Sequence, residues 1–268
     1  MRLRLLLCSV VLIGMSSQAG AADLGDSFLR GSSTIMSSSG APRWDGFYFG
    51  AQVGATYSGA DFSGATKSLV GSILRESNFN DAAVPDWNVL GKIDTSGSSI
   101  GGFVGYNTQW DDAVVGFELN YNRTSLAMAS TDWIGRQPAG MADSVYIDGN
   151  ASVRIIDYGT ARLRGGWTVG SFMPYGFVGV ALARADVSRS ATVNLVNPAF
   201  GAGPYFTDSR IESKLGDFAY GYAAGLGLDI CLISNLFVRA EYEYVQFGAF
   251  NEIKAHIHTA RVGAGVKF

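Results

Sequence analysis

Apolar and polar residues alternate along many short segments of the chain. From Phe47 to Tyr57 every second residue is apolar, and the residues between them, including Tyr48 and Gln52, are polar or small. A period of two puts successive side chains on opposite faces of a β-strand, so the two faces meet different environments. The same alternation recurs in four later segments: Ala113–Asn122, Phe218–Ile230, Leu236–Tyr244 and Arg261–Phe268. The pattern therefore predicts strands in these segments.

Three further segments alternate more weakly and bring the predicted number of strands to eight: Ser98–Trp110, Ile155–Gly170 and Pro174–Arg184. The connections between the strands differ in length. Three are short: Asp111–Asp112, Ser171–Met173 and Cys231–Ser234. The others are the long segments Ser58–Gly97, Arg123–Ser152 and Ala185–Ser213, and a shorter one, Gly248–Glu252. Short turns at one end and long loops at the other are typical of transmembrane β-barrels.

A soluble β-sandwich also alternates, but the segments here reach the roughly 9–11 residues that a membrane strand needs. The polar face combines charged residues with many glycines, of which the chain has 35. Lipid cannot hydrogen-bond an open sheet edge, so strands cross a membrane only as a closed barrel. Eight strands enclose an interior that side chains can fill. We therefore predict an all-β fold, an eight-stranded antiparallel up-and-down transmembrane β-barrel over residues 44–268.

The first 22 residues have the pattern of a secretory signal peptide. Arg2 and Arg4 precede the short apolar run Leu5–Ile13, and Ala19–Ala21 supplies the small residues of a cleavage site. The apolar run is shorter than the ~20 residues of a transmembrane helix. Residues 23–43 are rich in Ser and Gly, which predicts a flexible periplasmic segment. The chain is thus expected to be exported.

Charge and cysteine content narrow the function classes. The chain has 20 basic and 23 acidic residues, whereas a nucleic-acid-binding domain is normally basic. We therefore expect no nucleic-acid partner. Of the two cysteines, only Cys231 follows the predicted signal peptide. A single cysteine forms no internal disulfide, so the fold has to be stable without one.

Aromatic residues recur near both ends of the predicted strands. Those near the periplasmic ends are Phe47, Phe49, Trp110, Trp167 and Phe268. Those near the outer ends are Tyr57, Tyr121, Tyr220, Tyr244 and Phe247. Membrane barrels carry such girdles at the two lipid–water interfaces. The alternative interpretation is ordinary aromatic packing in a core.

Charged residues of both signs fall on the predicted inward face of the barrel. They are Glu118, Arg162, Arg164, Arg239, Glu241, Glu243, Arg261 and Lys267. One interpretation is a pore lining that selects ions. The other, which we favour, is a network of ion pairs that plugs a narrow barrel, because a buried charge without a partner costs several kcal/mol.

Several short stretches, taken in order, resemble one known family. They are Trp44–Gly50, Gly105–Gln109, Gly116–Glu118, Arg162–Trp167, Pro174–Tyr175, Glu241–Tyr244 and His258–Gly263. Each stretch alone is weak, whereas their order through the mature chain is specific. The sequence resembles the porin-family outer-membrane barrels of alpha-proteobacteria, the small surface antigens of Rhizobiales, which are similar in architecture to the transmembrane domain of OmpA.

The resemblance implies a surface-exposed protein of the cell outer membrane of a Gram-negative bacterium. It also implies that Phe268, preceded by alternate apolar residues, is the signal read by the barrel-assembly machinery during biogenesis. Val266 departs from the family, which often has Tyr there, and this departure would weaken the signal without removing it. Other expected partners are outer-membrane lipid and lipopolysaccharide. The resemblance fixes neither a substrate nor an oligomeric state.

His256 and His258 are the only histidines and share one face of the last predicted strand. Imidazole is a common ligand of metals and haem, and some relatives have been linked to haem. A pair without Cys or clustered carboxylates more often has a structural role, so we expect no cofactor and no metal. Thr259 and Glu252 lie near them in sequence, but neither histidine is part of the His-x-Ser arrangement known from barrel enzymes. We therefore expect no catalytic residues and no enzymatic activity.

The expected function is that of a structural barrel that supports envelope integrity and surface properties. One alternative is passive diffusion of small solutes through the barrel. The other is binding of a ligand, such as haem, or of a host surface by the loops. Trp87, Trp133 and Pro204–Phe206 lie in the predicted loops, where exposed aromatic residues either bind partners or cap the barrel mouth.

Overall fold

The computed structural model describes residues 42–201, 203–249 and 252–268. The predicted signal peptide, residues 1–22, and residues 23–41 of the predicted periplasmic segment lie outside these ranges. The alternating pattern folds into eight strands: β1 (Gly46–Asp61), β2 (Lys92–Trp110), β3 (Ala113–Arg136), β4 (Ser144–Trp167), β5 (Phe172–Val196), β6 (Pro204–Ile233), β7 (Leu236–Phe247) and β8 (Lys254–Lys267).

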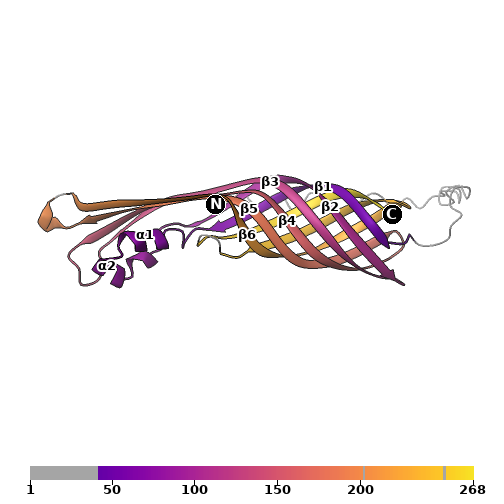
Figure 1. The fold of residues 1–268 in the computed structure, drawn as a ribbon, viewed down its shortest axis with the longest axis horizontal. Coiled ribbons are helices and arrows are strands. Elements are labelled where there is room, and N and C mark those ends of the chain that lie inside the picture. Colours follow the sequence, from indigo (N-terminus) through magenta and orange to yellow (C-terminus); the bar gives the residue numbers. More distant parts are fainter. Residues whose placement is uncertain (1–41, 202, 250–251) are drawn as a thin grey trace, which may run out of the picture. The chain divides into compact units, whose positions relative to one another are not determined.

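The strands form one closed antiparallel barrel in sequence order (Figure 1). β1 pairs with β2 on one side and with β8 on the other, so the ring has no open edge. The predicted eight-stranded up-and-down barrel is confirmed. None of the helices within the described residues combines the length and apolar character needed to cross a membrane.

The predicted short turns all lie at one end of the barrel. β2 and β3 are joined by Asp111–Asp112, and β6 and β7 by Ser234–Asn235. Between β4 and β5, Val169 and Phe172 form an isolated bridge around a tight turn. The start of β1 and the end of β8 lie at this same end, because Tyr48 pairs with Lys267.

The long connections differ from the prediction. Residues 123–152 and 185–213 were expected to be loops, but most of them continue β3, β4, β5 and β6 beyond the ring (Figure 1). β2 leaves β3 at the pair Ser99–Thr124, and β7 joins β6 only from Gly221. Beyond these points the four strands form a sheet of their own. We call residues 126–136, 144–155, 185–196 and 204–217 the outer sheet.

The outer sheet was missed because its apolar residues change face. In the barrel part of β5, Val178, Val180 and Leu182 point outward and are exposed. Further along the same strand, Val187 and Val193 point inward and are buried. Lipid surrounds the first part and water the second, so the apolar face reverses. The pattern of outward apolar residues therefore ends where the strand enters water.

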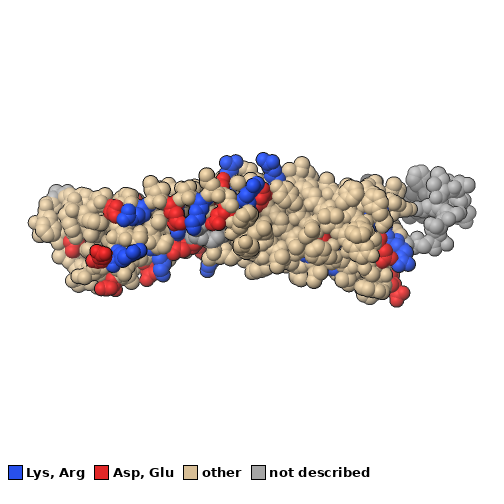
Figure 2. Space-filling view, in the orientation of Figure 1, with Lys and Arg blue, Asp and Glu red and all other residues tan. Residues whose placement is uncertain are grey.

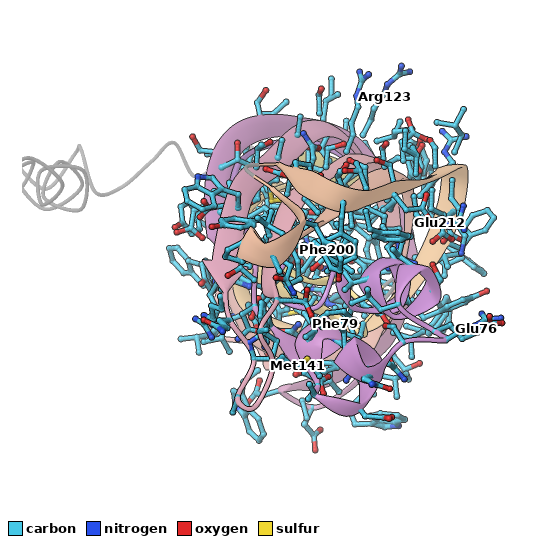
Figure 3. The ribbon with its side chains drawn as sticks, turned by 90° about the vertical axis from the view of Figure 1, so that its left-hand side faces the viewer. Glu76, Phe79, Arg123, Met141, Phe200 and Glu212 are labelled. Atoms are coloured by element: carbon cyan, nitrogen blue, oxygen red, sulfur yellow. The ribbon has the colours of Figure 1, made fainter. Side chains whose placement is uncertain are left out.

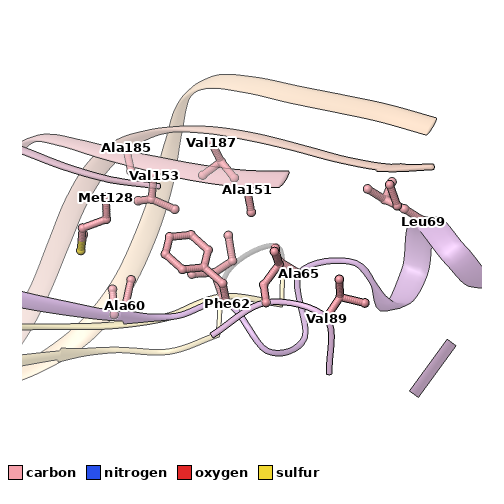
Figure 4. Packing of buried hydrophobic residues seen from close by; sticks show 14 of the residues in the cluster. Ala60, Phe62, Ala65, Leu69, Val89, Met128, Ala151, Val153, Ala185 and Val187 are labelled. Atoms are coloured by element: carbon pink, nitrogen blue, oxygen red, sulfur yellow. The ribbon is translucent and has the colours of Figure 1, made fainter. Parts of the chain in front are cut away.

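The segment between β1 and β2 covers the inner face of the outer sheet. It contains α1 (Lys67–Ile73), α2 (Asn78–Asp81) and a 3₁₀ turn, η1 (Val84–Asp86). A second 3₁₀ turn, η2 (Pro198–Phe200), lies between β5 and β6. We call residues 62–91 the outer cap. Figure 4 shows Phe62 of the cap among Val153, Val187 and other buried side chains of the outer sheet.

The two parts differ in surface charge. Figure 2 shows acidic and basic side chains side by side over the outer sheet and outer cap, while most of the barrel wall is free of charge. Leu226 illustrates the wall, because its side chain is 70% exposed on the outward face. Its neighbours Gly225 and Gly227 face inward, where a β-carbon would lie 2.4 and 2.3 Å from the Phe177 and Tyr175 rings. These glycines make room for aromatic rings inside the barrel.

Candidate functional site

A cluster of ion pairs fills the barrel interior. Its members come from five strands because inward positions of neighbouring strands fall at the same level. They are Glu118 of β3, Arg162 and Arg164 of β4, Asp229 of β6, Arg239, Glu241 and Glu243 of β7, and Arg261 of β8. Each of these residues is no more than 5% exposed. We call this set the interior charge cluster.

Glu118 is the centre of the cluster. Its carboxylate accepts a hydrogen bond from Arg162 Nε at 3.0 Å, from Arg164 Nη1 at 3.1 Å and from Arg239 Nη1 at 2.9 Å. The Tyr48 hydroxyl donates a fourth bond at 2.8 Å. One carboxylate therefore joins three guanidinium groups from two strands.

The remaining carboxylates extend the network around the ring. Asp229 accepts from Arg164 Nη2 at 2.6 Å and from Arg239 Nε at 2.8 Å. Glu241 accepts from Arg162 Nη1 at 2.8 Å, and Glu243 accepts from the same nitrogen at 3.0 Å.

Arg261 closes this side of the network. Its Nε donates to Glu241 at 2.6 Å, and its Nη2 lies 2.7 Å from Glu243. The four arginines of the cluster therefore meet four carboxylates, and the formal charges cancel.

Aromatic rings fill the space between the guanidinium groups. Arg162 lies 4.1 Å from the Phe177 ring centroid, and Arg164 lies 3.8 Å from that of Tyr175. Arg239 lies 4.1 Å from the Phe103 ring. Cation–π contact favours such stacking where water is excluded. The cluster is therefore packed across the lumen.

The structure brings together seven of the eight predicted interior charges. Lys267 is inward-facing but lies apart, near the short-turn end, where its ammonium donates to the Arg43 carbonyl and sits 4.6 Å from the Trp44 ring. Its assignment to the network was wrong. Asp229 was missed, although its register opposite Arg239 places the two side chains together. Cross-strand register was the signal that would have identified it.

Two further layers of side chains lie in the lumen toward the outer sheet. In the first, Gln52 donates to Asn120 and Asn122 at 2.9 and 2.7 Å. In the second, the interior is apolar, with Ile253, Ile257 and Phe62 fully buried in one cluster that continues into the outer sheet. The barrel is thus filled by charge, then amide groups, then hydrocarbon.

The two histidines lie on the outer wall of the barrel, as their spacing predicts. Their ring centroids are 5.4 Å apart, and His258 Nδ1 lies 2.7 Å from the Tyr242 hydroxyl. Thr259 points to the opposite face, where its hydroxyl lies 3.1 Å from that of Tyr158. His258 and Thr259 therefore cannot act as a base and nucleophile pair. Within the described residues, no group of three or more His, Cys, Asp or Glu side chains is arranged to hold a metal ion.

Nine of the ten predicted girdle residues, all except Phe247, lie on the outer wall. Eight are well exposed and Tyr244 is partly covered: Phe47, Phe49, Tyr57, Trp110, Tyr121, Trp167, Tyr220, Tyr244 and Phe268. Phe247 is the exception, because it is buried in the interior apolar cluster, and its assignment to the outer ring was wrong. It lies one residue out of phase with the outward side chains Tyr244 and Gln246.

The aromatic residues of the predicted loops divide into two groups. Trp87 packs against the apolar cluster of the outer cap, with Arg136 5.7 Å from its ring centroid. Trp133, Tyr205 and Phe206 are exposed on the outer sheet. Phe200, which the sequence did not single out, is exposed on η2 beside Tyr205, with ring centroids 5.2 Å apart. Figure 3 looks onto this end, with Phe200 and Phe79 near the middle of the view and Glu76 at its margin.

Comparison with known proteins gives one family and a set of relatives. The family described as outer membrane protein beta-barrel domain matches residues 9–268. The 25 kDa outer-membrane immunogenic protein of Brucella ovis is 26% identical over 225 residues, covering 84% of this chain and 78% of that protein. The protein of the same name from Brucella abortus is 25% identical, covering 84% and 79%.

Among solved structures, the attachment invasion locus protein Ail of Yersinia pestis is 14% identical, with a TM-score of 0.34. The match covers 84% of this chain and 99% of Ail. Neisserial surface protein A is 18% identical, with a TM-score of 0.36, and the match covers 83% of this chain and 97% of that protein. Likenesses at these scores add nothing to the fold, which rests on the strand pairing.

Proposed function

Since the chain belongs to the family of outer membrane protein β-barrel domains, we propose that it is a sealed structural barrel that supports envelope integrity and holds the outer sheet on the cell surface. The chain is an outer-membrane protein, like its relatives in Brucella. The short-turn end then faces the periplasm, and the outer sheet and outer cap face the medium.

The observation that carries this proposal is the filled lumen. Four arginines and four carboxylates meet across the barrel with no more than 5% exposure. Moving an ion through this level would require breaking several buried, charge-assisted hydrogen bonds at once. The apolar layer around Phe62 and Ile257 adds a second barrier.

Single-channel recording of the refolded protein in a planar bilayer tests this proposal. We expect silence from protein whose heat-modifiable gel mobility shows that it is folded. Sustained ion-selective steps would overturn the sealed barrel and support the alternative, passive diffusion of small solutes. A general porin recorded in the same bilayers is the positive control.

Two variants separate the barriers. Replacement of residues 62–91 by a two-residue turn deletes the outer cap, including Phe62 of the apolar layer, but leaves the interior charge cluster, so we expect it to stay silent. Glu118→Ala in the deletion variant removes the centre of the cluster, and we expect conductance to appear only then. Conductance from the deletion alone would mean that the cap, and not the cluster, seals the barrel.

The exposed aromatic residues of the outer sheet favour a second candidate function, binding of a ligand or host surface. Trp133, Phe200 and Tyr205 project at the end that faces the medium. Exposed aromatics are enriched where proteins bind partners. The Brucella relatives are named immunogenic, and a surface-exposed sheet in this chain would be accessible to antibodies in the same way. If Trp133→Ala abolished binding of the ligand or host surface by the folded protein, with unchanged gel mobility, this role would be supported.

We further propose that the protein is not an enzyme and takes no cofactor. The opposed faces of His258 and Thr259 support the first point. The outward wall of the barrel is proposed to contact outer-membrane lipid and lipopolysaccharide, and Phe268 to be presented to the barrel-assembly machinery. Hydrolase assays on the folded protein with lipid and peptide substrates should give no turnover.

A further inference from the structure

The outer part of β6 has an open edge. From Pro204 to Ala219 this strand pairs with β5 on one side only. On its other side, pairing with β7 begins at Gly221, and the last backbone contact is Gly248 N–H to the Tyr220 carbonyl at 2.9 Å. No described segment pairs with this side of residues 204–219. An open strand edge offers a row of backbone donors and acceptors to another strand.

The regular stretch of this edge reads the same in both directions when charge sign is inverted. Residues 208–214 are Asp-Ser-Arg-Ile-Glu-Ser-Lys. Ile211 is the centre, the serines at 209 and 213 match each other, and each acid is matched by a base on the other side. The pairing with β5 runs without a shift from Phe206 to Lys214 and becomes irregular just beyond it. The symmetric sequence therefore coincides with the straight part of the edge.

Antiparallel pairing of two such edges makes every charge complementary. With the two-fold axis at Ile211, Asp208 lies opposite Lys214 of the second copy, and Arg210 lies opposite Glu212 of the second copy. Opposite charges directly across an antiparallel pair are stabilising. On the other face, Ser209 then lies opposite Ser213 of the second copy, and Ile211 lies opposite Ile211 of the second copy. A two-fold interface requires this kind of self-complementarity.

The side chains concerned are accessible to a partner. Ile211 is 79% exposed, and the Arg210 and Lys214 side chains are 54% and 48% exposed. Within one chain, Arg210 pairs with Asp208 at 3.5 Å and Lys214 with Glu212 at 3.2 Å, both between neighbours on the same strand face. Glu212 also accepts a hydrogen bond from Arg189 Nε of β5 at 3.0 Å. The same groups can therefore be shared across the interface. Figure 3 shows Glu212 at the margin of the molecule.

The opposite edge of the outer sheet has less of this symmetry. Along residues 126–136 of β3, the only charged residues are Asp132 and Arg136. A centre at Ile134 places Asp132 opposite Arg136 of a second copy, but Trp133 and Gly135 beside it do not match. The β6 edge offers two such acid–base matches and matching serines, so its complementarity is the more extensive of the two.

We propose that the β6 edge is a homophilic docking surface, which joins two copies of this chain through an antiparallel β6–β6 pair centred on Ile211. Because the paired strands run in opposite directions, the two barrels lie at opposite ends of the joint sheet. Copies in one membrane run in the same direction, so the pair forms between two facing membranes. The contact is therefore one between cells, and it rests on the surface exposure of the outer sheet proposed above.

Vesicle clustering tests the proposal. Liposomes that carry the refolded full chain should cluster, as followed by light scattering, and protein-free liposomes should not. Asp208→Lys alone puts two lysines opposite each other, and Lys214→Asp alone puts two aspartates opposite each other, so each variant should lose clustering. Mixing the two kinds of liposome restores an acid opposite a base at both positions, and clustering should return. The control variant Asp132→Lys, on the β3 edge, should cluster like the original chain.

Cross-linking tests the strand direction. In a Cys8→Ser, Cys231→Ser background, liposomes with Ser209→Cys mixed with liposomes with Ser213→Cys should form a disulfide-linked dimer, and neither variant should do so alone. Self-linking of Ser209→Cys would indicate parallel copies in one membrane and overturn the proposal. Absence of clustering by the original chain, clustering by the single charge variants, or a mixture that stays dispersed would also overturn it. Unchanged gel mobility excludes misfolding, and none of these results bears on conductance.

Discussion

The barrel and the outer sheet are built from the same strands but are packed in opposite senses. In the barrel, Leu226 points outward and is exposed, and Glu118 points inward and is buried. In the outer sheet, Val187 is buried and Ile211 is one of few apolar side chains on the outward face. The reversal follows the solvent, because lipid replaces water around the first region. A single strand thus serves two media by reversing its sequence pattern, and a register shift marks the junction in each of the pairs β3–β4, β4–β5 and β5–β6.

The interiors of the two regions are also filled by different kinds of side chain. Ion pairs and aromatic rings fill the barrel, where several strands bring charges of both signs to one level. Hydrocarbon fills the space between the outer cap and the outer sheet. Removing one partner from a buried ion network leaves charge behind, whereas removing hydrocarbon leaves a cavity. The two regions should therefore respond differently to single substitutions.

Loss of the Glu118 carboxylate should have the largest effect. Glu118→Leu leaves three buried guanidinium groups short of an acceptor, and we expect the free energy of unfolding to fall by about 3–5 kcal/mol. Denaturant titration in lipid vesicles, read by gel mobility, measures this change. Glu76→Leu, at an exposed site after α1, should change stability by less than about 0.5 kcal/mol. An unchanged free energy of unfolding for Glu118→Leu would mean that the cluster relaxes around the missing charge.

Truncation of the outer cap should cost slightly less and act locally. Phe62→Ala removes a fully buried ring, for which we expect a loss of about 3–4 kcal/mol. The loss should appear as faster amide exchange and protease cleavage within residues 62–91, while the barrel keeps its heat-modifiable mobility. Equal destabilisation of the barrel strands would show that the two regions unfold together.

An arginine placed on the outward face tests directly whether that part of the strand contacts lipid or water. Leu226→Arg should destabilise the folded protein by about 2–4 kcal/mol, because the side chain would enter lipid. Ile211→Arg, also outward but on the outer sheet, should lie within about 0.5 kcal/mol of the original chain. Equal effects at the two positions, in the same vesicle titration, would contradict the reversal of solvent along the strands.

Acid should produce the smallest effect and should act on the outer sheet. The hydrogen bond from Arg189 holds the pKa of Glu212 below its ordinary value of 4.5. Because the pKa is lower in the folded state, this contact stabilises the sheet above pH 4.5 and is lost as the pH falls below it. Protease cleavage near residues 204–217 should therefore rise on acidification from pH 6 to about pH 3. Glu212→Gln should reduce this dependence.

The sequence predicts the barrel well because the strongest signal is outward apolar residues at every second position. Lipid enforces that signal, and the strand faces around Val53, Phe117 and Leu226 follow from it. The outer sheet carries the same period in the opposite phase, so the outward apolar pattern predicts loops there. Leu126 and Met128, which are buried in β3, already showed the change of phase.

The interior charges could be assigned to a face but not to contacts. Alternation alone places Lys267 and Arg261 on the same inward face, yet six residues of strand separate their levels. Register between strands decides which charges meet, and it depends on pairing across the whole ring. The outer cap could not be predicted from the sequence for a related reason. Its short helices are held by long-range apolar contacts and not by local propensity.

The seam between β1 and β8 has a consequence for the order of assembly. It joins Tyr48 to Lys267 and Asp61 to Lys254, positions about as far apart along the chain as the barrel allows. Contacts between such distant residues form late, because the loop they close is long. Until β8 is in place, β1 keeps an open edge that lipid cannot satisfy. Insertion and closure must therefore be completed together, so a chain stalled before Lys254 would have seven strands and no stable place in the bilayer.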